Sequence, residues 1–236
     1  MYLGLPESDH SEIQGLDLFK GIEPEQFQAL MRGAYVQTFP PQIELISEGD
    51  RSDFLHIVVE GSVELFAKWN GRETVMSTVY PVSTFILAAT IRDAPYLMSA
   101  RTLEKSRVVL LPSQDVRAVF DADAAFARAV VEELAKCYRA VVKNTKNLKL
   151  RSSLERLANY LLRQQIRAGG ADEFELVIEK RRLASYLGMT PENLSRAIKA
   201  LQPYGVIIDG ACVSITNRSD LEGFAKPSEL IDDPSC

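Results

Sequence analysis

The chain has 236 residues, of which 46% are hydrophobic and 25% charged, a balance typical of a folded globular protein with room for two modest domains. This composition excludes a disordered, collagenous or filamentous chain. Residues 1–7 carry no basic start or apolar core, and runs such as Phe85–Ala89 are far shorter than the roughly 20 residues of a membrane helix. Cys137, Cys212 and Cys236 are too widely spaced for a disulfide framework or a metal-binding pair. We therefore expect a cytoplasmic protein without a membrane partner.

Charge is distributed unevenly along the chain, although its total is only −5. Residues 139–218 contain 14 Lys and Arg against 7 Asp and Glu, whereas the remainder holds 13 basic and 25 acidic residues. An acidic N-terminal part is thus followed by a basic part. The basic part predicts a domain that binds nucleic acid.

The first half of the chain shows the pattern of a β-domain. Residues 1–15 lack periodicity and are expected to form a flexible lead, and a short helix is predicted around Pro24–Met31. Short β-branched and aromatic runs follow, separated by the turn signals Glu48-Gly49-Asp50, Glu60-Gly61 and Asn70-Gly71. About eight such strands predict a sandwich, roll or barrel over residues 16–122.

A long helix is predicted over residues 123–150, after a short one that starts at Ser113. Apolar residues recur along it at alternating steps of 3 and 4, which is the seam of a coiled coil. We interpret this seam as an interface between two copies of the chain, with packing on its own sheet as the alternative. The interface is assigned to Val130, Leu134, Cys137, Val141, Asn144 and Leu148.

Residues 151–226 carry the motif that indicates function. After an amphipathic helix, Leu154–Arg167, the segment 179–201 is predicted to form two short helices around a turn at Gly188, with Thr190 capping the second and Pro191 opening it. Residues 204–215 form two strands around Asp209-Gly210, which is the pattern of a wing. A structural helical hairpin with a solvated charged face is the alternative interpretation.

The second of these helices has an exposed polar face suited to a DNA major groove. Glu192, Ser195, Arg196 and Lys199 share it by helical spacing. Arginine can bind guanine O6 and N7, and glutamate can accept from cytosine N4, so base readout is assigned to Glu192, Ser195 and Arg196. Contacts to the DNA backbone are assigned to Arg181, Arg182, Thr190, Asn193 and Lys199.

From about Leu18 to Phe224 the chain resembles transcription regulators of the Crp/Fnr superfamily, through Glu48-Gly49-Asp50, Val58-Val59-Glu60-Gly61-Ser62-Val63, Leu183-Ala184 and Leu187-Gly188. The resemblance implies an α+β fold with a β-roll like the cyclic-nucleotide-binding domain, a dimerisation helix and a winged helix-turn-helix, followed by a tail at 227–236. It also implies a homodimer that binds double-stranded DNA and recruits RNA polymerase. Glu192-x-x-Ser195-Arg196 is similar to the Fnr branch, which binds inverted repeats of the TTGA type.

The sensor half departs from the cyclic-AMP-binding pattern of that superfamily. Ile86 and Leu87 stand where cyclic-AMP binders have a Gly-Glu pair, and Met98 stands where they have an arginine. A cyclic phosphate without its cation would be buried unpaired, so no cyclic AMP is expected. An N-terminal cysteine cluster is absent, so no iron-sulfur cluster is expected either.

The apolar residues at these positions are either core filling or an effector pocket, which we assign to Phe85, Leu87, Tyr96, Met98 and Ser99. This combination resembles the nitric-oxide-responsive denitrification regulators of the NnrR and Dnr group, and that resemblance makes haem a candidate cofactor. His56 and His10 are the histidines available as haem ligands, and packing in the fold is the alternative role of His56. Cys137 is a core thiol, a partner of its mate across the dimer, or an iron ligand.

Together these features predict an activator of genes for nitrogen-oxide or low-oxygen metabolism. Two alternatives remain, a ligand-free activator controlled by its own abundance and an interaction scaffold with a vestigial DNA domain. An enzyme is not expected, because the sequence offers no nucleophile-base pair, phosphate-binding loop or metal spacing.

Overall fold

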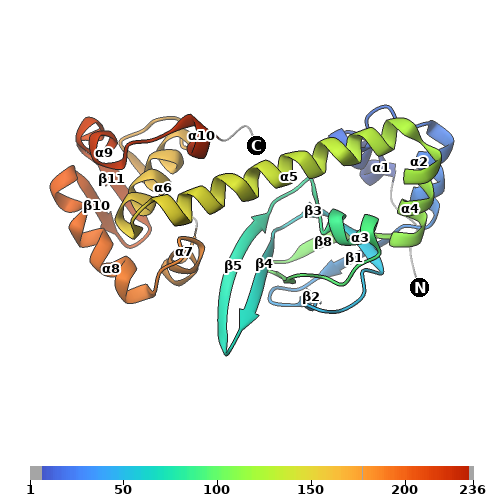
Figure 1. Ribbon diagram of the computed structural model, residues 1–236, viewed down its shortest axis with the longest axis horizontal. Helices are drawn as coiled ribbons and strands as arrows, with labels where there is room; N and C mark the ends of the chain where they lie inside the picture. The colour runs from blue at the N-terminus through green and yellow to red at the C-terminus, as the bar shows by residue number, and fades with distance from the viewer. Residues whose placement is uncertain (1–6, 177, 234–236) are drawn as a thin grey trace. The chain divides into compact units, whose positions relative to one another are not determined.

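The structure is a computed structural model that describes residues 7–176 and 178–233, and it divides into two compact units, residues 1–136 and 137–236. The boundary falls inside α5 (Ala124–Leu150), which is one uninterrupted helix (Figure 1). This helix agrees closely with the long helix predicted at 123–150. No helix in the described part of the chain is long and apolar enough to cross a membrane.

The first unit is a β-roll with short helices at its start. Its elements before α5 are α1 (Glu7–Gln14), η1 (Asp17–Phe19), α2 (Pro24–Arg32), β1 (Tyr35–Phe39), β2 (Glu44–Ile46), β3 (Phe54–Glu60), β4 (Val63–Trp69), β5 (Arg72–Val79), β6 (Ser83–Phe85), α3 (Leu87–Arg92), β7 (Ser99–Thr102), β8 (Ser106–Pro112) and α4 (Ser113–Ala122). The strands form two antiparallel four-stranded sheets, ordered β1-β8-β3-β6 and β2-β7-β4-β5. The α+β fold predicted from the sequence is confirmed.

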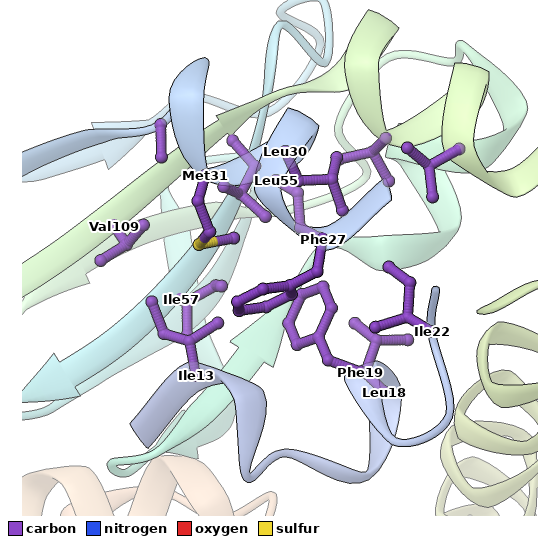
Figure 2. Packing of buried hydrophobic residues seen from close by; sticks show 14 of the residues in the cluster. Ile13, Leu18, Phe19, Ile22, Phe27, Leu30, Met31, Leu55, Ile57 and Val109 are labelled. Carbon is purple, nitrogen blue, oxygen red and sulfur yellow. The ribbon is translucent and has the colours of Figure 1, made fainter. Parts of the chain in front are cut away.

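The predicted flexible lead is wrong for residues 7–14, which form α1, whereas residues 1–6 lie outside the described residues. Ile13 on this helix is fully buried in the core that β3 shares with the helices. Figure 2 shows Ile13 beside Ile57 and the ring of Phe27. Burial of the Ile13 side chain contributes to holding α1 against the roll.

The core of the roll has two parts because side chains alternate along β3. Leu55 and Ile57 face the helices and contact the α2 side chains Leu30 and Met31 (Figure 2). Val58 faces the other sheet and packs in a second cluster with Phe85 and Tyr96. Phe19 belongs to the cluster that contains Leu55 and Ile57, and its ring stacks on Phe126 of α5 with 5.8 Å between ring centroids.

A buried carboxylate at Asp123 starts α5. Its Oδ1 accepts hydrogen bonds from the backbone N–H groups of Ala125 and Phe126 at 2.9 Å, and its Oδ2 accepts from the backbone N–H of Glu23 at 2.8 Å. These backbone donors hold the pKa of Asp123 below its usual value. The cap thereby satisfies two orphan donors of α5 and ties the helix to the start of α2.

The second unit contains the remainder of α5 and a winged helix-turn-helix. Its further elements are α6 (Ser153–Arg167), β9 (Glu173–Glu175), α7 (Lys180–Tyr186), α8 (Pro191–Ala200), η2 (Gln202–Tyr204), β10 (Val206–Asp209), β11 (Cys212–Ile215), α9 (Arg218–Ala225) and α10 (Glu229–Asp232). The antiparallel sheet has the order β10-β11-β9. The predicted wing around Asp209-Gly210 is present, and β9 adds a third strand that the sequence analysis did not predict.

The predicted tail at 227–236 is partly ordered, because residues 229–232 form α10 and Asp232 is held by ion pairs to Arg151 and Arg163. Residues 234–236 lie outside the described residues. The sequence does not predict α10, because a helix of four residues is too short to show a periodic pattern. Long-range ion pairs hold it in place.

Candidate nucleic-acid interface and sensor region

The turn between α7 and α8 is built from a glycine and a cap. Gly188 has φ of +65°, and a Cβ there would lie 3.1 Å from Leu148 Cδ2, so both backbone and space favour glycine. Thr190 Oγ1 accepts a hydrogen bond from the Asn193 N–H at 3.2 Å, and Pro191 opens α8. The two short helices therefore meet as the sequence predicted.

One face of α8 is buried and the other is free. Leu194, Ala197 and Leu201 are buried in the core of the second unit, and Ile198 packs partly against it. The predicted readout residues Glu192, Ser195 and Arg196 are all exposed, as is Lys199. The structure thus brings these four side chains together on the outer face of one rigid helix.

Polar contacts orient and ionise side chains on the exposed face of α8. Arg196 Nη2 donates to Asn193 Oδ1 one turn earlier, which holds the guanidinium along the helix. The backbone N–H at the helix start, then the Thr190 hydroxyl and the Arg196 charge, hold the pKa of Glu192 below its usual value. Glu192 is therefore an ionised acceptor at neutral pH, next to a cationic donor. This is the pair of groups that a G·C base pair can engage in the major groove.

The residues predicted to contact the DNA backbone differ in their exposure and in the hydrogen bonds that they already make. Arg181 in the first turn of α7 is exposed, whereas Arg182 is half-buried. The side-chain oxygens of Thr190 and Asn193 already accept hydrogen bonds within α8. Of this set, Arg181 and Lys199 are the cations best placed to contact phosphate.

A buried arginine supports the turn, and the sequence analysis missed it. Arg156 on α6 donates to the backbone carbonyls of Leu187 at 2.8 Å and Arg151 at 2.7 Å. It therefore joins the end of α5, the start of α6 and the turn before α8. The available signal was an arginine inside the apolar stretch that begins at Leu154.

The predicted dimer residues fall into two groups along α5. Val130 is fully buried and Leu134 packs against the same core of the first unit, so both face their own chain. This corrects the assignment of Val130 to the subunit interface, whereas Leu134 is only partly buried and its assignment stays a prediction. Cys137, Asn144, Leu148 and Val141 are exposed, and Val141 and its neighbour Tyr138 are 63% and 70% accessible.

The five residues assigned to an effector pocket divide between separate packed regions of the roll. Leu87 lies in the core on the helix side of the roll, whereas Phe85, Tyr96 and Met98 belong to the cluster between the sheets. Ser99 Oγ accepts a hydrogen bond from the Glu48 N–H at 3.0 Å. A hollow of about 430 Å³ lies beside β2 and residues 50–54, and of the five only Tyr96 lines it.

Arg101 is the cation nearest in sequence to the missing phosphate-binding arginine, and it is already paired. Its Nε donates to Glu64 Oε2 on β4 at 2.9 Å, and its Nη2 donates to Glu73 Oε1 on β5 at 2.7 Å. Its guanidinium carbon lies 4.4 Å from the centre of the Phe66 ring. Since Glu64 is fully buried, moving Arg101 to a ligand would break an ion pair with a buried carboxylate.

His56, a candidate haem ligand, is buried and also lines the hollow beside β2. Its ring stacks on Phe85 at 5.0 Å, and its Nδ1 is enclosed by protein atoms and has no hydrogen-bond partner. Burial, opposed by the Phe54 backbone, lowers the pKa of His56 to about 4, so the ring is neutral at pH 7. A ligand nitrogen needs the metal about 2 Å away, a position that the enclosed Nδ1 lacks in this packing, and the assignment of His56 as a haem ligand otherwise stays a prediction. His10 is half-buried on α1, and the described residues contain no cluster of three metal-ligating side chains.

Comparison with known proteins agrees with this architecture. Residues 36–123 match the model of the cyclic nucleotide-binding domain, and residues 155–224 match that of the Crp-like helix-turn-helix domain. The chain is 24% identical over 215 residues to a CRP-like cAMP-activated global transcriptional regulator of Mycobacterium tuberculosis, covering 89% of this chain and 96% of that one.

Solved structures show the same fold. FixK2 from Bradyrhizobium japonicum is similar with a TM-score of 0.68 and 22% identity, over 83% of this chain and 98% of that one. DNR from Pseudomonas aeruginosa is similar with a TM-score of 0.52 and 21% identity, over 94% of this chain and all of that one. A roll of the cyclic-nucleotide-binding type joined to a winged helix-turn-helix defines a DNA-binding transcription regulator rather than an enzyme. This chain belongs to the Crp/Fnr family.

Proposed function

We propose that the protein is a homodimeric activator that binds an inverted repeat of TTGA type and recruits RNA polymerase in the cytoplasm without cyclic AMP. The observation that carries this proposal is the exposed face of α8, on which Glu192, Ser195 and Arg196 stand together. Arg196 supplies two parallel donors for guanine, and the ionised Glu192 supplies an acceptor for the cytosine amino group. Neither group is needed for the packing of the helix.

The exposed part of the α5 seam supports dimerisation. Val141, Tyr138 and Leu148 expose apolar surface along the second half of the helix. A narrow apolar stripe on a long helix gains free energy when a second copy covers it. Two recognition helices related by a twofold axis then bind two half-sites about one DNA turn apart.

The ion pairs of Arg101 support independence from cyclic AMP. The relative from Mycobacterium tuberculosis is named as cAMP-activated, and the roll of this chain has the same general architecture. Here, however, Met98 replaces the phosphate-binding arginine, and Arg101 is held by Glu64 and Glu73. A cyclic phosphate would therefore find neither an arginine at position 98 nor a free guanidinium on Arg101.

The proposed targets, genes for nitrogen-oxide or low-oxygen metabolism, rest on the resemblance of Glu192-x-x-Ser195-Arg196 and of the apolar Phe85–Ala89 segment to the NnrR and Dnr group. The similarity to DNR adds the fold alone. The enclosure of His56 Nδ1 argues against haem at that nitrogen. The tight packing of Phe85, Tyr96 and Met98 at the positions predicted for an effector favours the second candidate, an activator controlled by its abundance.

Binding of fluorescent DNA tests the proposal. The protein should bind a TTGA-type inverted repeat at least tenfold more tightly than a scrambled repeat of the same composition at physiological salt. Adding cyclic AMP should change neither affinity, and calorimetry should show no micromolar binding of the nucleotide. Equal affinity for the two DNAs would contradict sequence-specific recognition, and a rise in affinity with cyclic AMP would contradict independence.

A further inference from the structure

The C-terminal segment 226–233 makes a dense set of polar contacts with the junction between α5 and α6. Asp232 Oδ1 and Oδ2 accept hydrogen bonds from Arg151 Nη1 and Nη2 at 2.8 and 2.6 Å, and Arg163 Nη1 donates to Oδ1 at 2.6 Å. Arg151 lies between the two helices, and Arg163 lies on α6. One carboxylate therefore binds the junction and the following helix together.

A second contact extends this clamp to α5. Lys143 Nζ donates to the backbone carbonyl of Asp233 at 3.0 Å and lies 3.6 Å from its Oδ2. The side chains of Arg151 and Asp232 are only 7% and 10% exposed, so these are not solvated surface pairs. Figure 1 shows α10, drawn in red, beside α6.

The position of the clamp matters because the α5–α6 junction is the only covalent link from the dimerisation helix to the DNA-binding elements. Arg156 connects the same junction to the turn before α8. A change of angle at Arg151 would therefore move α8 relative to the second half of α5. In a dimer, that movement changes the distance between the two recognition helices.

We propose that the C-terminal segment is a clamp in which Asp232 acts as a positioning residue, fixing the angle between α5 and α6 and so the half-site spacing that the dimer accepts. The inference rests on the proposed function, because spacing has meaning only for a dimer on an inverted repeat. Asp232 itself contacts no DNA in this role. It selects DNA through Arg151 and Arg163, whose positions it holds.

The test compares Asp232→Asn with Glu222→Gln on inverted repeats whose half-site spacing changes by single base pairs. Glu222 forms an exposed ion pair with Arg218 on α9, so its variant makes the same change in charge away from the junction. Asp232→Asn should lose about fivefold or more in affinity at the preferred spacing and discriminate less between spacings. Base preference within a half-site should remain, and Glu222→Gln should match the wild type.

A distance measurement without DNA separates this inference from the proposed function. Spin labels at Cys212 and at Ala140→Cys, with Cys137 and Cys236 replaced by serine and an excess of unlabelled chain, report the distance from α5 to the wing within one chain. We expect a narrow distribution that broadens in Asp232→Asn and in a chain ending at Lys226, but not in Glu222→Gln.

Each other outcome has a definite meaning. Wild-type spacing preference and an unchanged distance distribution in Asp232→Asn would overturn the clamp. A loss that is uniform over all spacings and over single half-sites, with a narrow distribution, would show general destabilisation and overturn it too. If the wild type fails to bind any inverted repeat while the distribution still broadens, the dimeric regulator proposal fails and the angle-fixing role stands.

Discussion

The Nε of Arg156 donates a hydrogen bond to the backbone carbonyl of Leu187 at 2.8 Å, although 31 residues separate them in the chain. The same guanidinium donates from Nη1 to the carbonyl of Arg151 at 2.7 Å. Burial lowers the pKa of Arg156 from its ordinary value, but the arginine remains charged in its neutral carbonyl surroundings. This residue therefore satisfies acceptors from two parts of the second unit at once, the α5–α6 junction and the turn before α8.

Arg156→Met should destabilise the protein. Methionine fills similar space but leaves the carbonyls of Leu187 and Arg151 without their partner, and such losses cost about 2 to 4 kcal/mol together. Chemical denaturation followed by circular dichroism measures the change in the free energy of unfolding. Arg167→Met, at an exposed position on the same helix, is the control. A loss below about 0.5 kcal/mol in Arg156→Met would show that these hydrogen bonds do not matter.

Stability should depend on pH through Asp232. Burial alone would raise the pKa of Asp232, but hydrogen bonds from Arg151 and the Ser228 N–H and the nearby arginine charges leave it below its usual value. A carboxyl whose pKa is lowered on folding stabilises the protein above its unfolded pKa of about 4, and this contribution is lost as pH falls through the folded pKa. The wild type should therefore exceed Asp232→Asn in stability at pH 5 to 7, and the two should converge as pH drops below about 4. A difference that persists unchanged at pH 3 contradicts this origin.

Helix α8 was predictable from the sequence because the residues that specify it are close together in the chain. Thr190 caps it, Pro191 opens it, and the spacing of Leu194 and Leu201 defines its buried face, all within a dozen residues. The hairpin at Asp209-Gly210 was predictable for the same reason, since a two-residue turn specifies its own geometry. The structure contains both elements, the helix α8 and the hairpin of β10 and β11.

The parts that depend on distant partners were not predictable. The 3,4 repeat of α5 continues through Val130 and Leu134 into Val141, and periodicity does not say whether the roll or a second copy covers each residue. Residues 83–92 split into β6 and α3 at Ile86, where φ is +66°, which the apolar run does not signal. The pairing of Arg101 with Glu64 and Glu73 depends on strand register, which no local motif encodes.

Val141→Asp should separate the dimer. Val141 is exposed and makes no part of the core, so the variant chain should keep its fold, whereas Leu134 would disturb the first unit. Ultracentrifugation should give about twice the 26.3 kDa chain mass for the wild type and a single chain mass for the variant. Ala135→Asp places the same charge at an exposed position about 120° around the helix from Val141, away from Cys137 and Asn144, and should remain dimeric. If Val141→Asp also sediments as a dimer at micromolar concentration, the α5 seam is not the interface.

Arg196→Ala should change which DNA the protein prefers, and not only how tightly it binds. If the guanidinium contacts guanine O6 and N7, its loss costs roughly 1 to 3 kcal/mol on the TTGA-type repeat and relaxes preference at that one base pair. Asn193→Ala removes the acceptor that holds the guanidinium along α8, so it should weaken the same preference to a smaller degree. Competition with all four bases at each half-site position measures both effects.

Arg181→Ala is the matched comparison for this prediction, because Arg181 is an exposed cation on α7, the helix expected to cross the DNA backbone. A phosphate contact has no sequence information, so its removal should weaken binding almost equally for every base and reduce the salt slope by about one unit. Arg196→Ala should instead lose affinity mainly for the preferred base. If Arg196→Ala behaves like Arg181→Ala, with an unchanged order of preference among the four bases, then Arg196 binds phosphate, and direct readout by α8 would have to rest on Glu192.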